Sequence, residues 1–214
     1  MNDLSSRRPL SVRSTGWARS LAGVLAKSGI SPNAISAASI GAALFGSGSI
    51  IAAGNCVHPW PAAWIVGAVF IQLRLICNLM DGMVAIEGGK KSPTGELWNE
   101  IPDRIADPIL LVSAGWAAGL PWVGALAGWA AIMTAYVRSI GATLTGEQDF
   151  CGPFAKQQRM ACLTIAVLLT AAESLWQGDK QILQLAVILI AVGTCITLVR
   201  RILRLAKKLR KTGP

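Results

Sequence analysis

The chain has 214 residues, of which 53% are hydrophobic and only 14% are charged, and its formal net charge is +9. Soluble domains carry about a quarter charged residues, so this composition excludes an ordinary soluble protein and predicts a single membrane bundle. The Lys and Arg residues gather near the two ends, beside apolar stretches, so we expect a lipid bilayer and no nucleic acid as the partner.

Residues 1–33 are predicted to form a cytosolic N-terminal segment. Within it, residues 12–28 mix large apolar side chains with Arg13, Arg19 and Lys27. This mixture is typical of an amphipathic helix that lies in the membrane interface. The following Gly, Ser, Pro and Asn residues at 29–33 break that helix and lead into the first apolar stretch.

Six apolar stretches are each long enough to cross about 30 Å of hydrocarbon. They cover residues 34–53, 61–80, 103–119, 121–143, 159–175 and 181–200. We therefore expect an all-α polytopic membrane protein with six transmembrane helices plus the N-terminal interfacial amphipathic helix. The transmembrane domain is predicted over residues 34–203, and a basic cytosolic tail over residues 204–214.

Six spans place both termini on one side of the membrane, and the excess of Lys and Arg there predicts that this side is the cytosol. The segment 87–102 and the loop 144–158 then share that side. We expect an integral protein of a bacterial inner membrane whose polar site and both termini face the cytosol.

Acid and amide side chains recur at three- and four-residue steps around the end of the second span. Asn78 and Asp81 share one helical face, as do Asn99, Asp103 and Asp107 on the next helix. In hydrocarbon such groups persist only when they are paired, bound to a metal or exposed to a watery cavity. Oxygen ligands that converge from two helices predict a site for a hard divalent cation.

With its spacing, this stretch is Asn-x2-Asp-Gly-x2-Ala-x9-Gly-x3-Asn-x3-Asp over residues 78–103. It resembles the signature of the CDP-alcohol phosphotransferase family, Asp-x2-Asp-Gly-x2-Ala-Arg-x8-Gly-x3-Asp-x3-Asp, and every gap matches. Ser31-Pro32-Asn33 before the first span is similar to the Thr/Ser-Pro-Asn sequence that is common in that family. The chain is identified on these residues as a variant member.

The resemblance implies an enzyme of phospholipid synthesis that transfers a phosphatidyl group from CDP-diacylglycerol to the hydroxyl of a polar alcohol and releases CMP. It implies a divalent metal, Mg²⁺ or Mn²⁺, and a homodimer. By position, the metal ligands would be Asn78, Asp81, Asn99 and Asp103, and Asp103 would also be the general base. The residues that line the CDP donor site would be Asp81, Gly82, Ala85 and Gly95.

The chain departs from the family pattern at three positions. Asn78 and Asn99 stand where the family has aspartates, and Ile86 stands where it has arginine. An amide oxygen can bind a metal but supplies no charge, so we expect weaker binding and one metal instead of two. Neighbouring acids could restore the lost charge: Glu96, Glu100 and Asp107. The alternative is a non-catalytic membrane relative that binds the CDP-lipid on the same scaffold.

Three basic residues are candidates for binding the acceptor: Arg138, Lys156 and Arg159. Arg138 lies in the fourth span, where a charge needs a reason, whereas Lys156 and Arg159 could also extend to the interface from the start of the fifth. In family members with phosphorylated acceptors, basic residues in these regions hold the acceptor phosphate. Arg74, one turn before Asn78, could pair with Asp81, extend to the interface or contact a phosphate. A transporter is disfavoured because the polar groups gather on one side and not at the midplane.

Overall fold

The computed structural model describes residues 14–56, 60–89, 93–176 and 178–212. In these residues the chain is all-helical, with seven α-helices, one short 3-10 helix and no strand, so the predicted all-α fold is confirmed. The helices are α1 (Gly16–Lys27), α2 (Pro32–Asn55), α3 (Pro61–Glu87), α4 (Gly95–Ala117), α5 (Pro121–Thr145), α6 (Lys156–Glu173), η2 (Ser174–Trp176) and α7 (Gln181–Thr212). Residues 1–13 of the predicted N-terminal segment and 213–214 of the predicted tail lie outside the described residues.

Proline starts three of the long helices: Pro32, Pro61 and Pro121 each occupy the first helical position. Proline suits this position because its missing N–H would have no partner inside the helix and its fixed φ is already helical. At the start of α2, the Ser31 hydroxyl also accepts a hydrogen bond from the Ala34 N–H at 3.2 Å.

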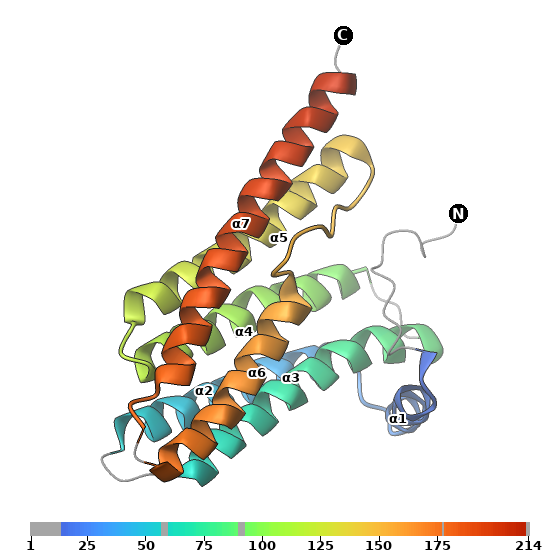
Figure 1. Cartoon of the computed structure of the whole chain (residues 1–214). Helices are drawn as coiled ribbons and strands as arrows, with labels where there is room; N and C mark the ends of the chain where they lie inside the picture. Colours follow the sequence, from blue (N-terminus) through green and yellow to red (C-terminus); the bar gives the residue numbers. More distant parts are fainter. Residues whose placement is uncertain (1–13, 57–59, 90–92, 177, 213–214) are drawn as a thin grey trace.

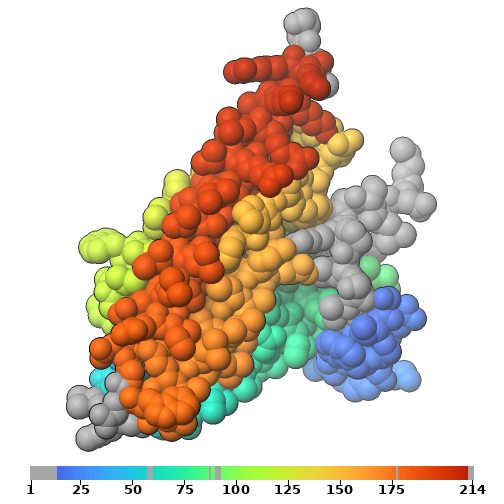
Figure 2. All heavy atoms as spheres, viewed as in Figure 1, coloured from blue at the N-terminus to red at the C-terminus, as the bar shows by residue number. Residues whose placement is uncertain are grey.

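The six long helices form a closed ring in which each packs mainly on two neighbours. The order around the ring is α2, α3, α6, α7, α5 and α4, and α4 closes it by packing on α2 (Figure 1). One face of the molecule shows α7, α6 and α3 as neighbouring bands, with α1 at the edge (Figure 2). The short α1 packs on α3, where Ala18 and Ala22 contact a cluster that includes Met80, Met83 and Val84.

Five of the helices are long and apolar enough to cross a membrane: α2, α3, α5, α6 with η2, and α7. They mark the chain as an integral membrane protein. The predicted third span corresponds to α4, which does not meet that criterion because its first half carries Glu96, Glu100, Asp103, Arg104 and Asp107. Membrane crossing by α4, which would raise the number of spans from five to six, therefore stays a prediction.

Two helix boundaries differ from those predicted. Helix α4 begins at Gly95, inside the segment 87–102, so Asn99 and Asp103 lie on one continuous helix. Helix α7 continues to Thr212, so the described part of the basic tail is helical.

Helix α5 and the loop that precedes α6 both hold the C-terminal part of α7. Arg201 donates from Nε to the Cys151 carbonyl at 2.9 Å and from Nη1 to the Thr134 carbonyl at 2.7 Å. Lys208 donates to Glu147 at 2.6 Å, and this bond holds the pKa of the exposed Glu147 carboxyl below its ordinary value.

Helices α4 and α5 approach each other closely at a pair of glycines. A Cβ added to Gly115 would lie 2.6 Å from the Gly124 Cα, and a Cβ added to Gly124 would lie 2.7 Å from the Leu111 carbonyl oxygen. Small residues at such a crossing allow two backbones to touch, which increases van der Waals contact between helices in a membrane.

We expect Gly115→Ala to lower the free energy of unfolding by about 1–3 kcal/mol, because the two helices must separate to admit the methyl group. The matched control is Gly48→Ala, since that exposed position on α2 has no atom within 4 Å of an added Cβ. Thermal unfolding in detergent micelles measures both variants. Equal melting temperatures would contradict the packing role assigned to Gly115.

Candidate functional site

Charged side chains collect where the second half of α3, the first half of α4 and the start of α6 meet. Five of them are at most 8% exposed: Arg74, Asp81, Asp103, Asp107 and Arg159. Charges buried in this way persist when they are paired or hydrogen-bonded. Their partners therefore define the site.

Arg74 links α3 to α4 and is fully buried. Its Nη2 atom lies 2.6 Å from Asp103 Oδ1 and 2.7 Å from Asp107 Oδ1. Only the first contact has hydrogen-bond geometry, since Asp107 Oδ1 and Arg74 Nε and Nη1 have no hydrogen-bond partner among the described residues. The suggested pairing of Arg74 with Asp81 was wrong, because Arg74 faces the acids of α4.

Lys156, the first residue of α6, joins the same two helices. Its ammonium donates to Asn78 Oδ1 at 2.7 Å and also to Asp103 Oδ2. The two oxygens of Asp103 are therefore paired with different cations, Arg74 on one side and Lys156 on the other. Asn78, Asp103 and Lys156 come together as one group, although the sequence assigned Lys156 to the acceptor and the other two to the metal.

Asp81 is held by neutral donors. Its Oδ2 accepts a hydrogen bond from the Ser36 hydroxyl at 2.7 Å, and its Oδ1 accepts from the Gly82 N–H at 2.5 Å. The sequence reasoning missed Ser36, which lies one turn into α2. The available signal was a serine one turn after Ser31-Pro32-Asn33, although Ser39, Ser47 and Ser49 on the same helix do not distinguish it.

A second charged group lies around Glu100. Both of its carboxylate oxygens are 2.9 Å from Arg138 Nη2, and Arg104 also pairs with it one turn along α4. The Arg138 guanidinium stacks over the Phe150 ring at 5.3 Å. Arg138 therefore has a structural partner, and no contact joins it to Lys156 or Arg159 in the described residues.

The other predicted residues are placed as follows. Arg159 donates from Nη1 to the Phe154 carbonyl at 2.9 Å, and its Nη2 lies 3.8 Å from Asp107 Oδ2. Asn99 and Glu96 are exposed on the first two turns of α4. Gly82 and Ala85 lie half-buried near the end of α3, and Gly95 starts α4.

The donor set can be tested against the predicted metal centre. Among the described residues, no group of three or more His, Cys, Asp or Glu side chains is placed to hold a metal ion. Asn78 and Asn99 are neutral, Asp103 and Asp107 are paired with cations, and Glu100 is paired with Arg138 and Arg104. These residues do not fit a pair of divalent cations, and the acids expected to restore charge are either paired or, as with Glu96, exposed.

Comparisons with known proteins place the fold. No protein-family model matches the sequence. The chain is similar to the inner membrane protein YnbA of Escherichia coli (strain K12), with 23% identity over 154 residues, which cover 70% of this chain and 75% of that protein.

Two crystal structures of the phosphatidylinositol phosphate synthase PgsA1 of Mycobacterium tuberculosis, a CDP-alcohol phosphotransferase, are similar to the chain. The structure with manganese and citrate has a TM-score of 0.72 and 16% identity, and the match covers 88% of each chain. The structure with CDP-DAG bound has a TM-score of 0.66 and 17% identity, over 88% of this chain and 92% of that one. The resemblance drawn from the motif is thereby confirmed for the fold.

We expect Arg74→Met to destabilise the protein by about 3 kcal/mol or more, because it leaves Asp103 and Asp107 buried without their cation. The control is Arg104→Met: the Arg104 and Glu100 side chains are 27% and 43% exposed, so loss of that pair should cost less than about 1 kcal/mol. Thermal unfolding in detergent micelles separates the two. An Arg74 variant as stable as the Arg104 variant would show that the buried pair does not hold α3 to α4.

Proposed function

We propose that the chain is a membrane CDP-alcohol phosphatidyltransferase, which moves the phosphatidyl group of CDP-diacylglycerol to the hydroxyl of a polar alcohol and releases CMP. One observation carries the proposal. The spaced motif of residues 78–103 lies on two helices joined by the Arg74–Asp103 ion pair, in a fold shared with a synthase whose crystal structure contains CDP-DAG. The identity of the alcohol is left open, because fold similarity does not define an acceptor.

The proposed site has a donor side and a base. Gly82 and Ala85, beside Asp81, leave room for the cytidine group, and Gly95 lets the nucleotide approach the start of α4. The acceptor oxygen forms a bond to the β-phosphorus that bears diacylglycerol, the bond from that phosphorus to the oxygen bridging to CMP breaks, and the hydroxyl proton passes to Asp103. Arg138 and Arg159 are the proposed contacts of the acceptor. For the proton transfer, Asp103 Oδ2 must exchange its contact with Lys156 for the hydroxyl.

Metal dependence is a separate matter. Dependence on Mg²⁺ or Mn²⁺ stays a prediction for this chain, drawn from the resemblance and supported by the manganese in the similar structure. The proton and charge steps proposed here use the chain's own side chains, because the donor set does not fit a pair of divalent cations.

A second candidate function is a CDP-lipid-binding membrane protein without catalysis. Two observations favour it: Asn78 and Asn99 replace acids of the motif, and the proposed base Asp103 is paired with two cations. Both candidates predict binding of CDP-diacylglycerol, and only the first predicts release of CMP.

The deciding experiment offers purified protein CDP-diacylglycerol with a panel of alcohols, including glycerol phosphate, inositol phosphate and serine, and measures CMP. We expect CMP release that depends on one acceptor, and running the assay with and without added Mg²⁺ or Mn²⁺ tests the metal dependence. In Asp103→Asn, turnover should fall at least about 100-fold because the base is lost, while binding of CDP-diacylglycerol persists. Binding without CMP release across the whole panel would favour the non-catalytic candidate.

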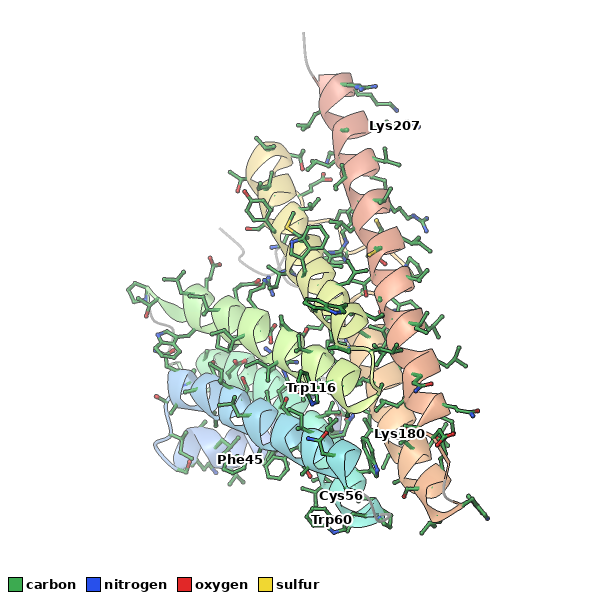
Figure 3. All side chains as sticks on the ribbon, turned by 90° about the vertical axis from the view of Figure 1, so that its left-hand side faces the viewer. Phe45, Cys56, Trp60, Trp116, Lys180 and Lys207 are labelled. Carbon is green, nitrogen blue, oxygen red and sulfur yellow. The ribbon has the colours of Figure 1, made fainter. Side chains whose placement is uncertain are left out.

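We also propose that α4 crosses the membrane as well, which makes six spans in all. Helix α1 then lies in the cytosolic interface, and both termini face the cytosol. Cys56 and Trp60 lie at one end of the bundle near Lys180, and Lys207 lies near the opposite end of α7 (Figure 3). Lys180 donates to the Gly54 carbonyl at 2.9 Å, so the last turn of α2 and the residue before α7 meet at that first end.

The topology predicts opposite labelling of the two ends. With the other four cysteines replaced, the exposed Cys56 should react with a membrane-impermeant maleimide in intact cells. In a cysteine-free background, Lys207→Cys should react only after the cells are permeabilised. The reverse pattern would invert the orientation, and labelling of both from outside would contradict an even number of spans.

A further inference from the structure

Lys156 lies between two residues that the motif assigns to a metal. Its ammonium contacts Asn78 Oδ1 on α3 and Asp103 Oδ2 on α4, and its side chain is 25% exposed. An ammonium has three N–H donors, and these contacts use two of them. The lysine thus gives the oxygen atoms of Asn78 and Asp103 a positive charge from the chain itself.

The position of this lysine on its helix is unfavourable without such partners. Lys156 is the first residue of α6, Arg159 lies in the same turn, and that turn contains no acid. A helix N-terminus carries partial positive charge, so cations there are disfavoured unless anionic groups offset them. Asp103 and Asp107, both on α4, supply that offset.

The charge balance around Lys156 leaves little attraction for a further cation. Three buried or half-buried cations, Arg74, Lys156 and Arg159, surround the two carboxylates of Asp103 and Asp107. A divalent ion placed between Asn78 and Asp103 would lie beside the ammonium and be repelled by it. The amide at position 78 is consistent with this. Its neutral oxygen can accept a hydrogen bond from an ammonium, whereas two positive charges on a metal would call for a negatively charged ligand.

We propose that the Lys156 ammonium is a built-in cation that takes the place of a divalent metal between Asn78 and Asp103. The N–H of Lys156 that neither Asn78 nor Asp103 uses has a second role, which rests on the proposed function: it donates a hydrogen bond to the diphosphate of the CDP-lipid. The buried Arg159 Nε, which has no hydrogen-bond partner among the described residues, adds a donor in the same helical turn. Asn78, Asp103 and Lys156 then form one hydrogen-bonded group, in which the lysine supplies the positive charge of a metal and the neutral amide accepts a hydrogen bond from it.

The first test measures binding of Mn²⁺ to detergent-purified protein by the electron paramagnetic resonance signal of the free ion. Wild type and Asn78→Asp should bind Mn²⁺ weakly, and Asn78→Asp with Lys156→Gln should bind it at least about tenfold more tightly, because the competing charge is gone. Glutamine keeps an N–H donor for Asp103. If Asn78→Asp alone binds as tightly as the double variant, Lys156 does not occupy the cation position and the proposal fails.

Two control variants distinguish the effect of the lysine charge on Mn²⁺ binding from an effect of misfolding. Gln157→Ala changes the exposed neighbouring residue and should leave Mn²⁺ binding unchanged. Lys156→Arg in the Asn78→Asp background keeps the charge and should keep Mn²⁺ binding weak. Tight binding in that charged variant would overturn the proposal even if the glutamine variant proved unstable.

The second test measures binding of CDP-diacylglycerol in nanodiscs with EDTA or with Mn²⁺. Wild-type affinity should differ by less than about threefold between the two conditions, while Lys156→Gln should lose about tenfold in EDTA. Wild-type binding that disappears in EDTA and returns with Mn²⁺ would overturn the proposal that the Lys156 ammonium takes the place of a metal. If wild type binds no CDP-diacylglycerol in either condition, the proposed function fails, and the Mn²⁺ titration still decides the role of Lys156.

Discussion

The structure depends on one constraint: a charge buried among apolar helices must meet an opposite charge or hydrogen-bonding groups. Arg74 is fully buried and is compensated by Asp103 and Asp107 on α4. Asp103 in turn holds Lys156 at the start of α6, and Asp107 lies beside Arg159. Because these contacts join α4 to α3 and to α6, neither of which is its neighbour in the ring, the charged cluster sets how the three helices meet and what surrounds the candidate site.

The two ends of the bundle are held in different ways. At the end with Trp60 and Lys180, most of the described contacts end on backbone carbonyls, as in the bonds from Lys180 to Gly54 and from Gln184 to Ala118. At the other end, ion pairs and the loop before α6 join α5 to the extended α7. Ion pairs between side chains are thereby concentrated at that end of the bundle.

A shared scaffold does not by itself establish a shared reaction. The chain has the fold of a phosphatidylinositol phosphate synthase, and it keeps the spacing of the motif, Asp81-Gly82 and Asp103. Two acids of the motif are amides, and one of these amides contacts a lysine from a distant part of the sequence. The contact from Lys156 gives the amide at motif position 78 a cationic partner from within the chain, while the spacing of the motif is kept.

The sequence alone determined the helical membrane class, the order of the apolar stretches and the spacing of the motif, because hydropathy and helical periodicity are local properties of the chain. Helix ends were less predictable: α4 and α7 extend beyond their apolar parts because tertiary contacts stabilise their charged turns. Ser36 as the partner of Asp81, Glu100 as the partner of Arg138, and Lys156 as the partner of Asn78 and Asp103 were decided only by the tertiary structure. The physical reason is that a charge in an apolar bundle is compensated by whichever polar or oppositely charged group the packing brings near, and these partners lie 38 to 78 residues away along the chain.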